Sequence, residues 1–156
     1  MDTVEICLGG IVFKATREWM FFPYENFILA RRDSQKGILK IALAESSNSR
    51  SPSAGELFET ARGFVSRENL PEPFDVKEPQ PGAYLFGAAS FKISEKNRDY
   101  LTRVLYLSRG KDMIFATYGC PWERREEEAV QQELYQCEKM ILSVRFASRE
   151  TPESTK

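Results

Sequence analysis

The spacing of strand-like segments in the second half of the chain is the feature that most limits its fold. Segments rich in β-branched and aromatic residues cover 84–93, 100–107 and 113–118, and only short turns separate them. The second turn lies at 109–112 and contains Gly110. Parallel neighbours need a crossover of about a dozen residues or more, which these turns cannot supply. The three segments therefore predict an antiparallel meander and argue against a doubly wound parallel sheet.

A tight hairpin is predicted at the N-terminus. Val4–Leu8 and Ile11–Ala15 are short β-rich runs on either side of Gly9-Gly10. Glycine accepts the positive φ angles that a two-residue hairpin turn requires. The pair of runs is therefore expected to form two antiparallel strands.

An unusually aromatic segment follows this hairpin. We interpret it as a loop that leads into a strand, which a polar turn at 31–37 joins to another strand at 38–44. Its rings are too many for one face of a strand to bury, which predicts an exposed patch that binds a partner. The alternative is that all of these rings pack in the core, beneath the 46–53 loop and the first helix. The candidate partner-binding residues are Trp19, Phe21, Phe22, Tyr24 and Phe27.

Two helices are predicted. Ser53 and Glu56 match a capping box, so a helix is expected over 54–67, after the serine-rich loop. The proline-containing stretch 70–82 then forms a stiff, extended connection. A second helix is expected over 123–142, because apolar residues recur there at helical spacing. The face turned toward the sheet comprises Val130, Leu134, Cys137 and Ile141.

Taken together, the elements predict one α+β domain over residues 1–147, closed by a short strand at 143–147 and followed by a polar tail at 148–156. The expected architecture is an antiparallel β-sheet flanked by helices. A chain of 156 residues fits a single domain, and a domain of this size folds without disulfides or a structural metal.

Charge and cysteine usage limit the partners and the compartment. The 22 basic residues nearly balance the 23 acidic ones, whereas a general nucleic-acid binder is strongly basic. The 3 cysteines form no metal or redox pattern, which predicts free thiols in a reducing compartment. The N-terminal residues show no signal-peptide pattern, and no apolar run is long enough to span a membrane. A cytoplasmic protein with no nucleic-acid or membrane partner is expected.

The chain contains no histidine. This excludes Ser-His-Asp and Cys-His nucleophile systems and every imidazole metal ligand. We therefore expect no catalytic residues of these types, no cofactor, and no zinc or redox metal. The acidic cluster of Glu123, Glu126–Glu128 and Glu133 matches either a cation site or a solvated helix start, and the helix start is favoured. Cys120 is interpreted as a packed cysteine at a strand-to-helix corner rather than a reactive thiol.

The C-terminal third combines a hairpin, a Glu-rich helix and a terminal Ser-hydrophobic-Arg-Phe strand. Its characteristic residues are Arg103–Leu107, Gly110, Ile114–Tyr118 and Glu138–Phe146, and Gly10–Phe13 with Trp19 open the chain. This combination resembles the Mog/PsbP-like superfamily. The similarity is clear over 100–146, and earlier in the chain it is one of topology. The proline that usually precedes the first tryptophan of these domains is absent, since Ala15–Glu18 stands there.

This resemblance implies an α/β/α sandwich and, for most members, work without catalysis. Relatives include a Ran-binding nuclear protein, a photosystem II extrinsic subunit and bacterial adaptor chaperones for type VI secretion effectors. Fold alone does not choose among such functions. The leading hypothesis is a bacterial, non-enzymatic domain that binds another protein. The alternatives are an adaptor chaperone that shields apolar segments of an effector, and a carboxylate-based hydrolase. The sequence leaves the oligomeric state open.

Overall fold

The structure is a computed structural model that describes residues 2–34, 36–45, 52–65, 71–80 and 84–146. A three-stranded antiparallel sheet has the order β1-β2-β10, and a seven-stranded antiparallel sheet has the order β3-β4-β5-β9-β8-β7-β6. The strands are β1 (Thr3–Leu8), β2 (Ile11–Thr16), β3 (Trp19–Pro23), β4 (Ile28–Arg32), β5 (Ile38–Glu45), β6 (Phe74–Lys77), β7 (Leu85–Glu95), β8 (Arg98–Arg109), β9 (Asp112–Pro121) and β10 (Arg145–Phe146). The α-helices are α1 (Ala54–Gly63) and α2 (Glu128–Leu142).

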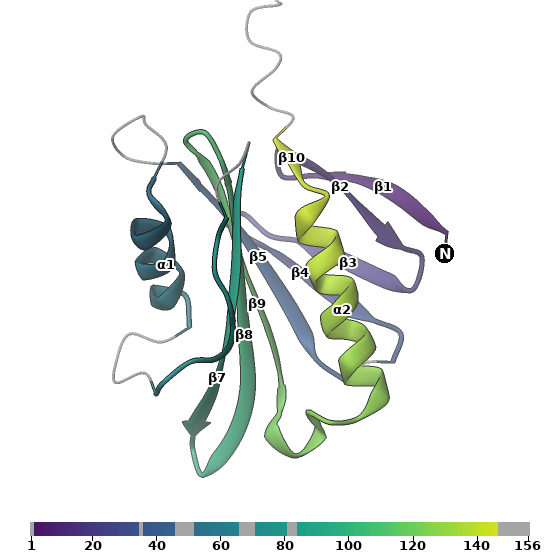
Figure 1. Ribbon diagram of the computed structural model, residues 1–156. Coiled ribbons are helices and arrows are strands. Elements are labelled where there is room, and N and C mark those ends of the chain that lie inside the picture. The colour runs from purple at the N-terminus through teal and green to yellow at the C-terminus, as the bar shows by residue number, and fades with distance from the viewer. Residues whose placement is uncertain (1, 35, 46–51, 66–70, 81–83, 147–156) are drawn as a thin grey trace, which may run out of the picture.

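The elements form an α/β/α sandwich around the seven-stranded sheet. Figure 1 shows α1 on one face of this sheet, and α2 with the small sheet on the other. Leu57 and Ala61 of α1 pack on side chains of β7, β8 and β9. Val130, Cys137 and Ile141 of α2 pack on the opposite face together with residues of β2. The predicted α+β class and sandwich are confirmed.

The turns that shape the sheets lie where the sequence places flexible residues. Gly9 and Gly10 have φ of 60° and 86°, which confirms the predicted hairpin turn between β1 and β2. Gly110 has φ of 63° in the turn between β8 and β9. The meander β7-β8-β9 is therefore present as predicted, with each strand longer than the sequence indicated.

Two segments predicted as loop or connection are strands. Trp19–Pro23 forms β3 at one edge of the large sheet, and Phe74–Lys77 forms β6 at the other. Proline lowers the strand signal in both regions, but edge strands tolerate it because one side of their backbone needs no partner. The predicted loop leading into β4 was therefore wrong.

Helix α1 begins as the sequence predicts. The Glu56 amide donates to Ser53 Oγ at 3.1 Å, and the Ser53 amide donates to Glu56 Oε1 at 2.8 Å. This pair is the expected capping box. The helix ends at Gly63, before the expected limit of 67. The last residues of that prediction, most of the serine-rich loop, part of the proline-containing connection and the polar tail lie outside the described residues.

Helix α2 begins at Glu128 instead of at 123, because Trp122–Arg124 forms a single 3-10 turn first. Val130, Cys137 and Ile141 are buried as predicted, whereas Leu134 is only half-buried. Leu134 packs against the edge of the core and also borders a cavity. Glu133, which a hydrophobic pattern places outside, is fully buried because it accepts several hydrogen bonds beneath the sheet.

Candidate functional site

The aromatic side chains of β3 point alternately to the two faces of the large sheet. Trp19 and Phe21 point toward α2, and Trp19 is 5% exposed. The Trp19 Nε1 donates to Gln136 Oε1 of α2 at 3.0 Å, and the Phe21 ring contacts the Phe13 ring edge-on with centroids 5.3 Å apart. These two predicted partner-binding residues belong to the core, because successive strand side chains point to opposite faces.

Phe22 lies on the other face of β3 and is 40% exposed. It pairs with Leu29 across β4, and Leu29 pairs with Lys40 across β5. Met20 pairs with Arg31 in the same way, so these side chains share one face of the sheet. We call this surface the β3–β5 face; it comprises Met20, Phe22, Leu29, Arg31, Ile38 and Lys40.

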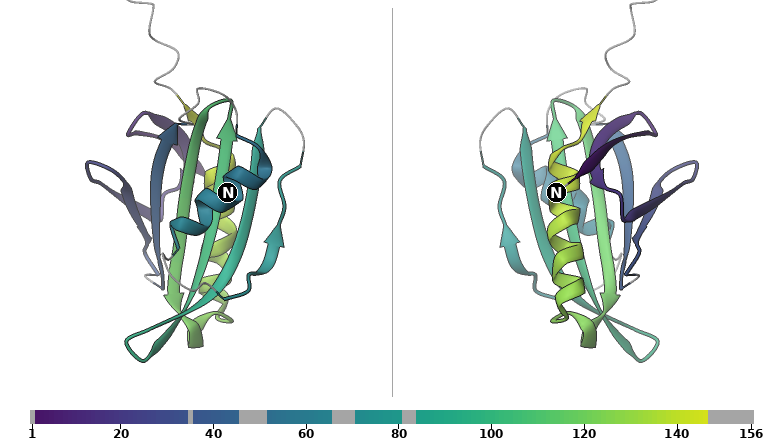
Figure 2. Two further views of the ribbon diagram at one scale, coloured as in Figure 1. Left: turned by 90° about the vertical axis from the view of Figure 1, so that its left-hand side faces the viewer. Right: turned by 90° about the vertical axis from the view of Figure 1, so that its right-hand side faces the viewer.

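Helix α1 covers only part of that side of the large sheet. Its packing partners are Phe91 of β7, Val104 and Tyr106 of β8, and Met113 and Phe115 of β9. In the left view of Figure 2 the helix lies across the green strands, and the purple-blue hairpin at the left stands clear of it. The β3–β5 face is the half of the sheet that α1 leaves uncovered, with Met20 58% exposed.

The loop between β3 and β4 extends this surface with two more of the predicted rings. The Tyr24 amide donates to the Phe27 carbonyl at 2.8 Å, and the two rings stand 4.9 Å apart. The Lys40 Nζ lies 4.6 Å from the centre of the Phe27 ring, a cation–π contact that holds Phe27 over β5. This surface contains a groove of about 300 Å³, which is lined by Phe22, Tyr24, Leu29, Arg31 and Ile38. Three predicted residues, Phe22, Tyr24 and Phe27, therefore meet at one site.

A buried carboxylate supports this half of the sheet from behind. Glu133 of α2 accepts hydrogen bonds from Tyr118 Oη at 2.7 Å, the Gly37 amide at 3.1 Å and the Lys36 amide at 3.3 Å. It also accepts one from the Ser34 hydroxyl. Three of the four donors belong to the turn between β4 and β5. The network ties the uncovered hairpin to α2, which keeps the β3–β5 face rigid.

The acidic cluster does not form a cation site. Glu133 is turned into the core, while Glu126–Glu128 are exposed at the helix start, and Glu127 pairs with Lys36 at 3.2 Å. Among the described residues there is no group of three or more His, Cys, Asp or Glu side chains arranged to hold a metal ion. The favoured interpretation, a solvated helix start, agrees with this geometry for every member except Glu133.

The thiols of β9 and α2 are packed rather than activated. Cys120 and Cys137 are buried, and Cys7 is exposed. Burial, with a smaller effect of Glu133, raises the pKa of the Cys120 thiol to about 11. Burial also raises the pKa of Cys137 well above its ordinary value. A thiol that stays protonated at neutral pH is a poor nucleophile, which agrees with the packed interpretation of Cys120.

Sequence reasoning missed Met20, Ile38 and Gly37 in this region, and it assigned Glu133 to an acidic cluster instead of the core. Met20 and Phe22 alternate with Trp19 and Phe21, and this period of two was the available signal for a strand with one exposed face. Ile38 was placed in a strand, but only the structure shows that its side chain is uncovered, with 40% exposed. No sequence signal identifies the buried role of Glu133, because its donors come from a distant turn.

The sheet with helices on both faces defines a class of fold, and comparison with solved structures supports the same class. The chain has a PsbP-like fold. The solution structure of cyanobacterial PsbP (CyanoP) from Synechocystis sp. PCC 6803 superposes with a TM-score of 0.58 at 10% identity, over 93% of this chain and 91% of that one. The resemblance found in the sequence is thereby confirmed at the level of fold.

A crystal structure of a protein from Bacteroides thetaiotaomicron VPI-5482 is similar as well. Its TM-score is 0.56 at 12% identity, over 88% of this chain. This chain spans only 45% of that protein's length. No family model matches the sequence, and no curated protein sequence matches it. Of the described helices, neither is long and apolar enough to cross a membrane.

Proposed function

We propose that this chain is a non-enzymatic, PsbP-like domain that binds another protein through the β3–β5 face. The observation that carries the proposal is the exposure of Met20, Phe22, Tyr24 and Ile38 on the half of the sheet that α1 leaves uncovered. Exposed apolar side chains that adjoin one another on a rigid surface are typical of protein interfaces. Large aromatic rings supply contact area at a small cost in side-chain entropy.

The position of β3 adds a second way to bind. It is an edge strand of the large sheet, so its outer backbone groups are open to pairing with an extended segment. Main-chain hydrogen bonds to such an edge give affinity, and pockets beside it give specificity. The groove beside Phe22 and Tyr24 lies next to that edge. Arg31 and Lys40 on the same face favour a partner segment that carries acidic side chains beside apolar ones.

A double variant, Phe22→Ala with Tyr24→Ala, tests the proposal. Both side chains are exposed, so the melting temperature should stay near that of the wild type while partner retention falls. Retention is measured by affinity capture from the native host, mass spectrometry, and binding of the identified partner in purified form. Tyr135→Ala is the matched control, because Tyr135 is an aromatic residue of α2 that is 61% exposed on the other side of the sheet. Unchanged retention by a folded double variant would refute the proposal.

The same face fits the adaptor-chaperone function, because Phe22, Leu29 and Ile38 give the groove an apolar lining. Under that hypothesis the occupant is an apolar segment of a larger effector. Synthetic segments of the identified partner separate the two functions. Binding of an isolated apolar segment, lost in the double variant, favours the chaperone, whereas binding only of the folded partner favours the general domain.

A further inference from the structure

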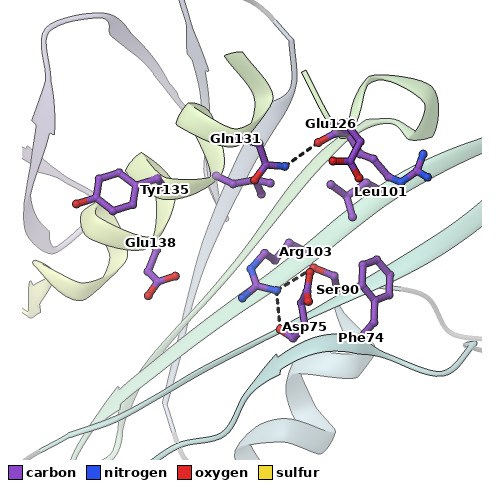
Figure 3. Close-up of a pocket in the computed structure, with 11 residues that line it drawn as sticks. Phe74, Asp75, Ser90, Leu101, Arg103, Glu126, Gln131, Tyr135 and Glu138 are labelled. Carbon is purple, nitrogen blue, oxygen red and sulfur yellow. Dashed lines mark hydrogen bonds between the residues drawn. The ribbon is translucent and has the colours of Figure 1, made fainter. Parts of the chain in front are cut away.

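A second concave site lies on the opposite face of the large sheet, between α2 and strands β6 to β8. This cavity has a volume of about 330 Å³, a size at which proteins hold small molecules. Figure 3 shows Arg103 of β8 pointing into it, with Glu138 and Tyr135 on the helix opposite. Phe74, Leu101 and Leu134 supply apolar walls.

One nitrogen of Arg103 is fixed by the sheet. Its Nη1 donates to Ser90 Oγ at 2.8 Å and to the Asp75 carbonyl at 3.0 Å. Ser90 stands directly across from Arg103 in the pairing of β7 with β8. Asp75 has φ of 50°, at an irregularity in the pairing of β6 with β7 that turns its carbonyl oxygen toward Arg103. These two bonds hold the plane of the guanidinium in one orientation.

The remaining edge of the guanidinium is unused. A guanidinium has five N–H donors, and Nη1 contributes only two. Among the described residues, Nε and Nη2 of Arg103 make no hydrogen bond, and no carboxylate lies within 4.0 Å of its nitrogens. Glu138, which lies opposite Arg103 in Figure 3, is engaged with Lys77 Nζ at 2.6 Å. The free Nε–Nη2 edge is the side of arginine that binds the two oxygens of a carboxylate in parallel.

Charge and lining decide between the anions that this edge can bind. Arg103 and Arg125 share the lining with Asp75, Glu126 and Glu138, and Lys77 pairs with Glu138, so the charges around the site balance. Such a site offers no excess of positive charge to a doubly charged phosphate, whereas Arg103 matches the single charge of a carboxylate. The apolar walls favour a ligand with an apolar part. Burial lowers the pKa of Arg103, and Glu138 and Asp75 oppose that effect, so the group keeps its charge at neutral pH.

The geometry points to a binding site for a small monocarboxylate with an apolar tail, bound through both free nitrogens of Arg103. The site is separate from the β3–β5 face, so this proposal does not depend on the proposed binding of a protein. Leu134 packs against the core and is only half-buried because it also forms a wall of this site.

Titration of the full chain with 3-phenylpropionate, followed by ¹H–¹⁵N NMR, tests the site. The Nε–H signal of Arg103, identified by its loss in Arg103→Lys, should shift in a saturable manner together with the amides of Leu101 and Gln131. The neutral amide 3-phenylpropanamide and inorganic phosphate are the comparison ligands. Weaker binding of both supports a monocarboxylate site. Equal shifts with the amide would overturn the role of Arg103, and tighter binding of phosphate would overturn the ligand class.

Two variants test how Arg103 and Glu138 affect the affinity for the ligand. Arg103→Lys keeps the charge but loses the two parallel donors, so the affinity should fall by about tenfold or more. Glu138→Gln removes the carboxylate that faces the guanidinium and releases Lys77, so the affinity should rise several-fold. The second variant leaves the bonds of Arg103 to Ser90 and Asp75 intact, which keeps the test valid if Arg103→Lys does not fold. An unchanged or weaker affinity in Glu138→Gln would count against the site.

Discussion

Tyr118 donates its hydroxyl to Glu133 Oε1 at 2.7 Å, and both side chains are fully buried between the large sheet and α2. The bond joins the central strand β9 to the helix at a point where a hydrophobic core would ordinarily continue. Burial, together with the hydrogen bond to Glu133, raises the pKa of the Tyr118 hydroxyl far above its ordinary value, so the hydroxyl stays protonated and able to donate to Glu133. A buried carboxylate is tolerated only where such donors surround it.

The first prediction is that Glu133→Gln destabilises the chain by about 2–4 kcal/mol, because the amide leaves buried donors of the β4–β5 turn without a full acceptor. Tyr118→Phe removes one donor and should cost about 1 kcal/mol. Urea denaturation measures both. Glu128→Gln on the exposed start of the same helix is the control and should leave the midpoint unchanged. A midpoint for Glu133→Gln equal to that of Glu128→Gln would show that the network contributes nothing.

The second prediction compares two glycines. A Cβ at Gly37 would overlap the Tyr118 ring and lie 2.7 Å from the Gly119 carbonyl oxygen, so Gly37→Ala should displace the ring and weaken its bond to Glu133. A Cβ at Gly55, in the exposed first turn of α1, would meet no atom within 4 Å. Gly55→Ala should therefore raise the unfolding free energy by about 0.5–1 kcal/mol, as alanine favours the helix.

Thermal melts of the two alanine variants provide the check. Gly37→Ala should melt below the wild type and Gly55→Ala above it. A higher melting temperature in both variants would mean that the structure accommodates the added Cβ at position 37 without losing stability. The proposed role of Gly37 would then be wrong.

Local patterns in the sequence were sufficient for most of the framework. The pair Gly9-Gly10, the capping box of Ser53 and Glu56, and the short turn at Gly110 each depend on neighbours along the chain. The elements that they define appear where they were expected. The fold class follows, because consecutive strands with short turns must be antiparallel.

Features that depend on distant residues could not be predicted in this way. Leu134 and Glu133 are adjacent on α2, and helical periodicity placed the apolar one inside. The structure leaves Leu134 half-buried and buries Glu133 fully, because Ser34 and Gly37 of the turn between β4 and β5 donate hydrogen bonds to the Glu133 carboxylate. Strand β3 was not predicted from the sequence, because its exposed face is as apolar as its buried face and the usual alternation of apolar and polar residues is absent. Of the five residues predicted to bind a partner, Phe22, Tyr24 and Phe27 lie at the proposed surface, where their role stays a prediction, while Trp19 and Phe21 pack in the core.

The third prediction concerns alkaline pH. Burial raises the pKa of Cys120 from an ordinary value of 9.0 to about 11, and that of Tyr106 from 10.0 to about 12. The folded state therefore keeps protons that the unfolded state releases above pH 9. The stabilisation from each group is fully present below its unfolded pKa and is lost as the pH rises through the folded pKa. The unfolding free energy should fall from pH 9 toward pH 11.

Denaturation at intervals between pH 7 and pH 11 measures this decline. Cys120→Ala removes one contributing group, so its stability should fall less steeply between pH 9 and pH 11 than that of the wild type. Cys7→Ala, at an exposed thiol, should follow the wild-type slope. Identical slopes in all three proteins would contradict a buried, protonated Cys120.

The last prediction separates the two halves of the aromatic segment. Trp19 and Phe22 belong to the same short strand, yet Trp19 is 5% exposed and bonded to Gln136, while Phe22 is 40% exposed on the β3–β5 face. Trp19→Ala should therefore lower the unfolding free energy by about 3–5 kcal/mol, as the loss of a large core side chain does. Phe22→Ala should change it by about 1 kcal/mol or less. Urea denaturation of the two variants gives both values, and a loss of 3 kcal/mol or more in Phe22→Ala would assign that ring to the core and remove it from the proposed binding surface.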